Sequence, residues 1–252
     1  MPNYDRYGAP RRKKKKNSLV APLSFVLVCL AIVFALGVFF RVQEIEVRGA
    51  ESYTAEEIID ASGIDMGDNL FFINRSTASS NIFSRKPFVE EASIERILPN
   101  TIIIKVEESR ALAYVDWEGQ TWMMTGGCKM LGSGTMEELQ GLIHVKNITP
   151  ANVSAGEIMT VDPAESLKLT YVQELLQCMD GLGMTADVTE IDIQNAADPT
   201  FEYLDRFTVK MGPNENTDYK LRKLLSAVMD MDASLMGTVD LSDGTAVHVS
   251  PD

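Results

Sequence analysis

The residues that could carry chemistry are few and scattered along the chain. The sequence has two histidines, His144 and His248, and three cysteines, Cys29, Cys128 and Cys178. His144 has no cysteine or histidine near it in the sequence, and a zinc site needs several such ligands at short spacing. The sequence also lacks G-x-S-x-G, H-E-x-x-H, phosphate-binding-loop and C-x-x-C motifs. We therefore expect no catalytic residues, no metal site and no cofactor.

The second histidine and the acids beside turns have structural explanations. His248 lies between Val247 and Val249, an alternation that indicates one face of a strand rather than a metal ligand. Asp240 and Asp243 lie next to a turn, where carboxylates hydrogen-bond the nearby backbone. None of these positions predicts a reactive centre.

The cysteines allow one disulfide at most outside the apolar N-terminal region. Cys29 lies inside that region, so only Cys128 and Cys178 could pair in an oxidising compartment. Because nothing else in the sequence indicates a disulfide framework, we expect two separate, partly buried thiols.

The longest uncharged stretch runs from Leu19 to Phe40, between a basic run at residues 11–16 and Arg41. About 22 residues of helix span about 33 Å, which is enough to cross the hydrocarbon core of a bilayer. A cleaved signal peptide and a buried core helix are the alternatives, but the stretch is longer than the apolar core of a signal peptide and lacks a small-residue cleavage site. We expect a basic cytoplasmic tail at residues 1–17 and a retained transmembrane helix at residues 18–40, with the rest outside the cytoplasm.

Charge separates the ends of the chain. The 252 residues carry a net charge of −13, but residues 41–252 hold 16 basic and 35 acidic side chains, a net charge of −19. Such an acidic exterior argues against binding to nucleic acid or lying on anionic lipid. About 210 residues also suffice for one or two domains with their own cores.

The first part of the exterior predicts a small β-α-α-β-β domain. A strand is expected at 42–48, and Thr54 and Glu57 form a capping box for a helix that begins at Ala55 and ends at Gly63. A second helix is expected at 75–84, followed by strands at 89–97 and 102–108 around the turn 98–101. This order predicts one sheet with two helices on one face.

Residues 109–252 predict a second α+β domain with an antiparallel sheet. Strands are expected at 111–116, 120–124, 188–193, 207–211, 237–241 and 245–249, and the glycine-rich stretch 125–160 is expected to be rich in loops. A helix is expected to begin at Asp162–Glu165 and to bury Leu167, Tyr171, Leu175, Met179 and Leu182. A second amphipathic helix is marked by Leu221, Leu224, Leu225, Val228 and Met231.

The last strand is the feature that most invites a functional interpretation. It follows a turn at residues 242–244, and the sequence given ends at Asp252. A strand in this position is often the edge of a sheet, with backbone N–H and C=O groups available to a second chain. The alternative is an edge protected by nearby charge.

The order of motifs resembles one known family. The motifs are Ile45-Glu-Val-Arg-Gly49, Gly67-x-Asn69-Leu70-Phe71, Leu98-Pro-Asn-Thr-Ile102, Val188-Thr-Glu-Ile-Asp-Ile193, Val209-Lys-Met-Gly212, Lys220-Leu221 and Gly237-Thr-Val-Asp-Leu-Ser242. In this order, after a basic tail and one span, they resemble the FtsQ/DivIB cell-division proteins. The resemblance implies a POTRA domain at residues 41–109 and an FtsQ/DivIB-type β domain at residues 110–252.

The resemblance also implies a function. Members of that family are non-enzymatic scaffolds of the bacterial divisome, expected at the septum, which bind FtsB/DivIC-like and FtsL-like bitopic partners and help regulate septal peptidoglycan synthesis. In the family the partner adds a strand to the last strand of the β domain. Carried over by motif, the partner-binding residues are Thr245, Ala246, Val247, His248, Val249, Leu224 and Val228. This sequence lacks the tryptophan-type anchors that some members place near the strand, and residues 125–160 match no part of the pattern.

Two other classes of function remain as alternatives. One is a POTRA-bearing transport or chaperone module, although no series of amphipathic barrel strands follows the first domain. The other is an anchored extracytoplasmic enzyme, for which the sequence offers no motif.

Overall fold

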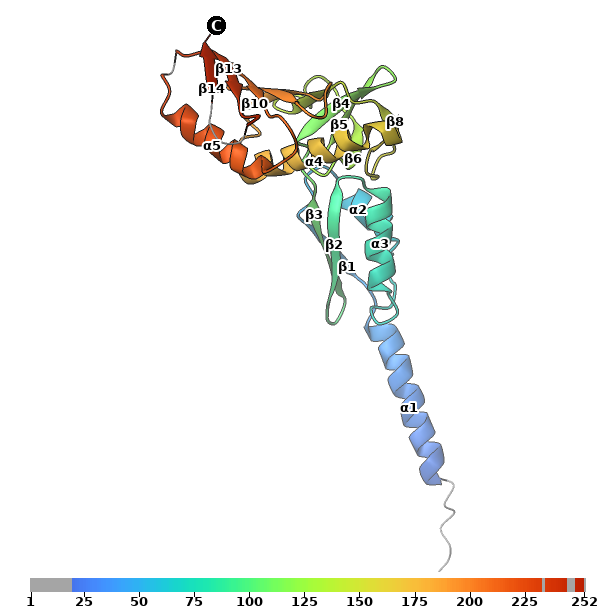
Figure 1. Cartoon of the computed structure of the whole chain (residues 1–252). Helices are drawn as coiled ribbons and strands as arrows, with labels where there is room; N and C mark the ends of the chain where they lie inside the picture. Colours follow the sequence, from blue (N-terminus) through green and yellow to red (C-terminus); the bar gives the residue numbers. More distant parts are fainter. Residues whose placement is uncertain (1–19, 233, 244–247, 252) are drawn as a thin grey trace, which may run out of the picture.

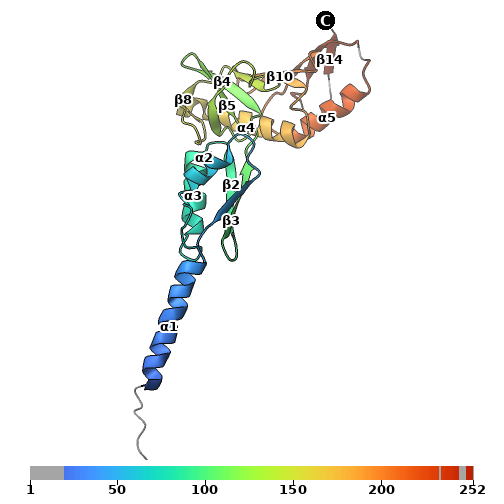
Figure 2. The ribbon, with the colours of Figure 1, turned by 180° about the vertical axis from the view of Figure 1, so that it is seen from behind.

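The computed structural model describes residues 20–232, 234–243 and 248–251. Three parts follow one another along the long axis of the molecule: a single helix, a small α/β unit and a larger unit with a wide sheet (Figure 1). The view from behind shows the same order, with the C-terminus at the end of the molecule farthest from the first helix (Figure 2). The last described strand, β14, therefore lies at the opposite end of the molecule from α1.

The first helix, α1 (Val20–Phe39), is apolar on all sides. Within the described residues, Pro22–Phe39 is the only segment long and apolar enough to cross a membrane, with a mean hydropathy of 2.7 and no part of it buried. The helix lies inside the range expected from the sequence, whereas the expected tail at 1–17 falls outside the described residues. The exposed apolar surface of α1 indicates a membrane anchor.

The small unit has the expected β-α-α-β-β order. Its sheet has the strand order β1-β3-β2, in which β1 runs parallel and β2 antiparallel to β3. Its elements are β1 (Glu44–Arg48), α2 (Ala55–Ser62), α3 (Arg75–Arg85), β2 (Val89–Ile97) and β3 (Thr101–Glu108). Both helices lie on one face of this sheet (Figure 1).

Local sequence signals set the limits of α2, and apolar side chains form the core beneath it. The Thr54 backbone N–H donates to Glu57 Oε2 at 2.9 Å, and the Glu57 N–H donates back to Thr54 Oγ1 at 3.3 Å. Gly63 ends the helix with a left-handed φ of 69°. Ile58 from α2 and Ile104 from β3 are fully buried in the same cluster.

The larger unit is built on one nine-stranded sheet of order β14-β13-β12-β11-β10-β7-β4-β5-β6. The strands are β4 (Ala113–Trp117), β5 (Gln120–Met124), β6 (Met130–Ser133), β7 (Ile143–Lys146), β10 (Val188–Asp192), β11 (Thr200–Tyr203), β12 (Phe207–Lys210), β13 (Gly237–Asp240) and β14 (His248–Pro251). The pairs β4–β7, β7–β10 and β12–β13 are parallel. The α+β class is confirmed, but the sheet is mixed rather than antiparallel because helical crossovers connect several neighbouring strands.

Two helices pack on one face of this sheet, α4 (Ser166–Gly181) and α5 (Thr217–Met229). A 3₁₀ turn, η1 (Pro163–Glu165), precedes α4, with the Asp162 carboxylate accepting from the Ala164 N–H. Tyr171, Leu175 and Met179 are buried as expected, together with Val172 and Leu176, and Leu182 is half-buried against the core. The expected burial of Leu167 is wrong, because its exposed fraction is 73%. Four residues turn a helix by about 400°, so Leu167, four residues before Tyr171, falls outside the buried stripe.

Two further expectations change in detail. Residues 125–160, expected to be rich in loops, contribute β6 and β7 to the sheet and form a small separate ribbon of β8 (Pro150–Asn152) and β9 (Thr160–Val161). The final strand, expected at 245–249, is described as His248–Pro251, and Thr245, Ala246 and Val247 lie outside the described residues.

Candidate partner-binding edge

Strand β14 is the outermost strand of the large sheet. It pairs only with β13, in the antiparallel register Asp240↔His248, Val239↔Val249, Thr238↔Ser250 and Gly237↔Pro251. Its other side faces no strand within the described part of the chain. Such an edge presents a row of backbone groups that a strand from a second protein can pair with.

The hydrogen bonds of β13 show which groups of β14 face outward. The Gly237 N–H donates to Arg206 O at 3.1 Å, and the Leu241 N–H donates to Lys210 O at 2.9 Å. Because backbone groups alternate in direction along a strand, the odd-numbered residues of β13 point to β12, and Thr238 and Asp240 point to β14.

The antiparallel register extends this alternation into β14. Ser250 and His248 lie opposite Thr238 and Asp240, so their backbone groups face β13. The N–H and C=O of Val249 therefore point away from the sheet, as does the C=O of Pro251. Val249 is the residue of β14 whose donor and acceptor are both presented at the free edge.

The two faces of the sheet next to this edge have different chemistry. Val209 and Val239, paired across β12 and β13, are both fully buried in the core. Lys210 and Asp240, the next pair in the same register, alternate to the opposite face.

A tight turn after β12 supports the hairpin of β13 and β14. Gly212 has a φ of +65°, and a Cβ at this position would lie 2.5 Å from the Ser242 Cα. Ser242 is the second residue after β13, and its N–H donates to Asp240 Oδ1 at 2.8 Å. Only glycine allows the two backbone segments to approach so closely, and this contact fixes where the final hairpin begins.

Three side chains hold the Gly212 turn in place. The Tyr171 hydroxyl donates to Gly212 O at 2.9 Å, and the Gly212 N–H donates to Asp198 Oδ1 at 3.0 Å. The Lys220 ammonium, 3% exposed, donates to Met211 O at 2.7 Å and to Pro213 O at 2.9 Å. Burial lowers the pKa of Lys220 and raises that of Tyr171. Gly212 and Lys220 belong to the sequence motifs noted above. In the structure they stabilise the turn after β12, which contacts the segment that follows β13.

The two α5 residues expected at the site have different positions. Leu224 is fully buried in the core, and Val228 is half-buried against it. Both therefore support the sheet from its helical face, and Leu224 offers no surface to a second chain. The large exposed apolar side chains of this region are instead Tyr219 and Met229 on α5 and Met236 immediately before β13. The sequence analysis did not name Met236 as a candidate. The available signal was its position immediately before Gly237, the first residue of the hairpin.

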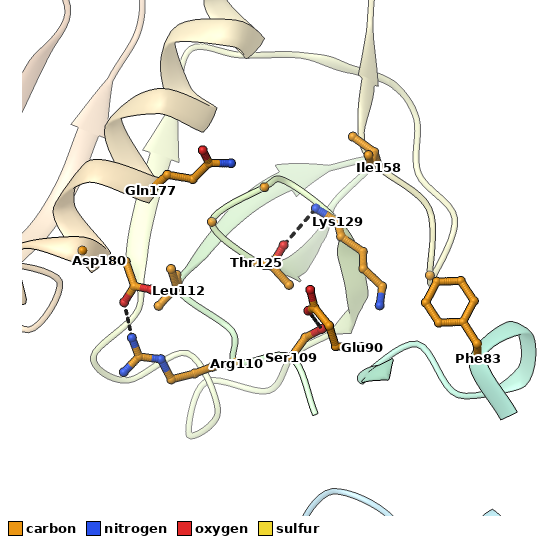
Figure 3. Close-up of a pocket in the computed structure, with 14 residues that line it drawn as sticks. Phe83, Glu90, Ser109, Arg110, Leu112, Thr125, Lys129, Ile158, Gln177 and Asp180 are labelled. Carbon is orange, nitrogen blue, oxygen red and sulfur yellow. Dashed lines mark hydrogen bonds and ion pairs between the residues drawn. The ribbon is translucent and has the colours of Figure 1, made fainter. Parts of the chain in front are cut away.

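A second concave feature lies where the small unit meets the large one. A cavity of about 760 Å³ is lined by both units. In Figure 3, Lys129 and Phe83 approach each other from opposite sides, and Arg110 reaches Asp180. Lys129 Nζ donates to Val89 O at 2.9 Å and lies 5.0 Å from the centre of the Phe83 ring. These contacts join the two units and lower the pKa of Lys129 through burial.

The serine at the cavity and the described histidine each have a carboxylate partner. At the cavity the Ser109 hydroxyl donates to Glu90 Oε2 at 2.6 Å, and Ser109 itself is buried. His144 lies 2.9 Å from Asp116 Oδ2 and stacks on Tyr114. No group of three or more potential metal ligands occurs among the described residues.

Comparison with known proteins decides the family. The model of the FtsQ-type POTRA domain matches residues 40–109, which is the small unit with its junction to α1. The chain is 26% identical over 249 residues to the cell division protein DivIB of Clostridium botulinum strain Hall, covering 94% of this chain and 93% of the relative. The chain belongs to the FtsQ/DivIB family. Proteins of this family are non-enzymatic division proteins.

Other members of the FtsQ/DivIB family match shorter regions. DivIB of Geobacillus kaustophilus is 37% identical over 113 residues, which is 44% of this chain and 42% of the relative. FtsQ of Corynebacterium glutamicum is 32% identical over 103 residues, which is 40% of this chain and 46% of the relative. The likeness to the clostridial DivIB protein thus extends over almost the whole chain, whereas the higher identities apply to less than half of it.

Proposed function

We propose that this FtsQ/DivIB-family protein is a bitopic divisome scaffold. Its N-terminus is in the cytoplasm, α1 spans the cell membrane, and a POTRA domain and a β domain, residues 41–109 and 110–252, lie outside at the division septum. It binds FtsB/DivIC-like and FtsL-like bitopic proteins and through them helps assemble and regulate septal peptidoglycan synthesis.

The observation that supports this proposal is the free edge of β14. The edge ends a wide sheet, lies farthest from α1, and directs the Val249 N–H and C=O outward. A partner strand in the FtsB/DivIC-like protein would continue the sheet by backbone pairing. Of the residues expected to bind it, Val249 and His248 lie on the described strand, Leu224 and Val228 pack in or against the core beneath the sheet, and Thr245–Val247 lie outside the described residues.

The decisive experiment removes one backbone hydrogen-bond donor from the free edge. Val249→Pro removes the outward N–H, whereas Val249→Ala keeps it and loses only part of the side chain. We expect Val249→Pro to weaken capture of the FtsB/DivIC-like partner by the full-length chain at least about tenfold, a loss of roughly 1.4 kcal/mol. Val249→Ala should retain most of the capture.

A second variant separates loss of pairing from loss of folding. Ser250→Pro removes an N–H that faces β13, so it disrupts the hairpin itself. Hydrogen exchange at the β13 amides should therefore stay slow in Val249→Pro and become fast in Ser250→Pro. Undiminished capture by Val249→Pro would refute strand addition at this edge.

A further inference from the structure

The POTRA unit is joined to α1 without a flexible linker. The Leu70 N–H donates to Phe40 O at 2.9 Å, and the Asn69 side-chain amide donates to Leu36 O at 3.1 Å in the last turns of α1. The Phe40 and Phe71 rings meet edge to face with their centres 5.0 Å apart. A helix end whose carbonyls are satisfied by the next domain cannot swivel freely. The POTRA unit therefore has a set orientation relative to the axis of α1.

Exposed apolar side chains gather at the end of the POTRA unit that meets α1. Of the six large apolar side chains exposed between residues 41 and 109, five lie in two segments, the loop 66–73 and the β2–β3 turn. Phe72 is 86% exposed, Met66 63% and Leu98 58%, and Phe71 and Ile97 complete the set. We call these five side chains the POTRA base. Clusters of exposed large apolar groups mark surfaces that meet a membrane or another protein.

The β2–β3 turn descends alongside α1. Pro99 and Asn100 line one side of a groove of about 580 Å³, and Phe34, Val38 and Phe39 line the other. The turn therefore lies beside the C-terminal end of α1, and Figure 1 shows the β2–β3 hairpin pointing towards the level at which α1 ends.

The length of the apolar segment leaves little room to lift the POTRA base out of the bilayer. As a helix, the uncharged stretch Leu19–Phe40 would extend about 33 Å, close to the thickness of the hydrocarbon core. If the last turns of α1 lie in hydrocarbon, a turn at the level of Phe34–Phe39 lies in the interfacial layer beside them. Withdrawing the base into water would expose the apolar end of α1 as well.

The charge around the base is mixed, whereas the exterior as a whole is strongly acidic. Residues 41–252 carry a net charge of −19, which opposes adsorption on anionic lipid. Asp65 and Asp68 flank Met66 in the base, but Arg41 after α1, Arg75 at the start of α3 and Arg96 on β2, whose guanidinium donates to Ile73 O, border it as well. Arginines in such positions can pair with lipid phosphates.

We propose that the POTRA base is seated in the interfacial layer of the outer leaflet, with Phe72 and Leu98 among the lipid. This inference rests on the proposed function insofar as α1 must span the membrane. The bilayer would then hold the POTRA unit upright and set the distance of the β14 edge from the membrane surface. An amphipathic surface of this kind binds at the boundary between headgroups and acyl chains.

The test measures the depth of single tryptophans in the full-length chain reconstituted in phosphatidylcholine–phosphatidylglycerol vesicles. Trp117 and Trp122, both in the β domain, provide a constant background. Phe72→Trp is expected to be quenched by lipids brominated near the glycerol end of the acyl chain and less by lipids brominated near the chain terminus. Leu167→Trp, at a 73% exposed position of α4, should be quenched by neither.

A third tryptophan separates the two proposals. Phe25→Trp lies within α1 and should be quenched by the deeply brominated lipid. If Phe25→Trp is quenched and Phe72→Trp is not, the anchor stands and seating of the base in lipid is wrong. If neither is quenched, the spanning helix itself is refuted. The bitopic partners could also remove the quenching of Phe72→Trp when they are added to the vesicles. That result would show that a partner, and not lipid, covers the POTRA base in the complex, and it would also overturn the inference.

Discussion

Gly212 and Ser242 approach each other so closely that any side chain at Gly212 would collide with the Ser242 backbone. The position of a Cβ at Gly212 lies 2.5 Å from Ser242 Cα and 3.0 Å from Ser242 O. This contact ties the turn after β12 to the first residues beyond β13. The position of the free edge thus depends on a glycine that is neither on the edge nor in contact with any partner.

Gly212→Ala is expected to loosen the final hairpin. The substitution adds strain at a φ of +65° and forces two backbone segments apart, at a cost of at least about 2 kcal/mol. Hydrogen exchange at the β13 amides should accelerate, and capture of the partner should fall. Gly183→Ala is the matched control: it has a φ of +70° with no atom within 4 Å, so it carries only the backbone strain of roughly 1 kcal/mol. Equal effects from the two variants would contradict the role given to the contact with Ser242.

Lys220→Met should destabilise the same turn by a different route. It removes the donors to Met211 O and Pro213 O while retaining an unbranched apolar chain in the buried site. Leaving buried carbonyls without these donors costs about 1–3 kcal/mol. Chemical denaturation of the β domain should report the loss. Lys223→Met on the same helix is the control: Lys223 is half-buried and its ammonium lies 4.8 Å from the centre of the Tyr219 ring, so the midpoint should fall by less than in Lys220→Met.

The pKa of Lys220 also gives this variant a pH signature. Burial lowers the pKa in the folded state, so between that pKa and the value of about 10.4 for an unfolded lysine the unfolded chain binds more protons. The contribution of Lys220 to stability therefore rises with pH in this window and is flat below it. The wild type should exceed Lys220→Met in free energy of unfolding by a margin that grows as pH rises through this window. A margin that shrinks instead would contradict a buried, desolvated ammonium.

Local signals in the sequence predicted the POTRA unit well, because its elements follow from neighbouring residues. The capping box of Thr54 and Glu57 and the stop at Gly63 set α2 to its observed bounds. The alternation in β2 and β3 likewise identified the strands on either side of a short turn. Elements fixed by contacts within a few residues can be read without knowing the fold.

The β domain was predicted less completely because its elements depend on distant partners. Strands β6 and β7 have four residues each, and nothing in so short a segment shows that β7 will lie between β4 and β10. The burial of Leu167 was predicted wrongly because a spacing of four residues overshoots a full helical turn, so the first residue of the series falls outside the buried stripe of α4. The edge could be expected from the position of the strand, but the direction of the Val249 backbone required the register of β13 and β14.

Cys128 and Cys178 should differ sharply in reactivity. The structure leaves both thiols unpaired, with Cys128 fully buried and Cys178 half-buried. Burial raises the pKa of Cys128 to about 12, so almost no thiolate is present at pH 8. In native protein a maleimide should label Cys178 slowly and Cys128 not at all, as read by peptide mass spectrometry. A disulfide-linked peptide pair from oxidised protein would contradict this assignment.

The raised pKa of Cys128 also predicts weaker folding at alkaline pH. The folded chain keeps the proton between the unfolded value of about 8.5 and the folded value of about 12, so stability falls as pH rises through that window. Cys128→Ala removes this slope, although it also leaves a small cavity. Its stability relative to wild type should therefore improve from pH 8 to pH 11 even if it is lower at neutral pH. If the difference in free energy of unfolding between the two proteins stayed constant over that range, the Cys128 thiol would have the same pKa in the folded and unfolded chains.

Lys129 should hold the two extracytoplasmic units in one arrangement. Lys129→Met removes the bond to Val89 O and the approach of the charge to the Phe83 ring, contacts worth about 0.5–1.5 kcal/mol each. With Cys29 and Cys178 changed to serine, spin labels at Glu91 and Thr189 should give a broader distance distribution in this variant. Lys105→Met changes the same charge on the POTRA surface, where it pairs only with Glu95 in an exposed ion pair. It should leave the distribution narrow, because an exposed pair within one unit does not restrain the other. If the two variants gave the same distribution, the junction would have to be held by the apolar side chains that line the cavity from both units, such as Phe83 and Ile158, instead.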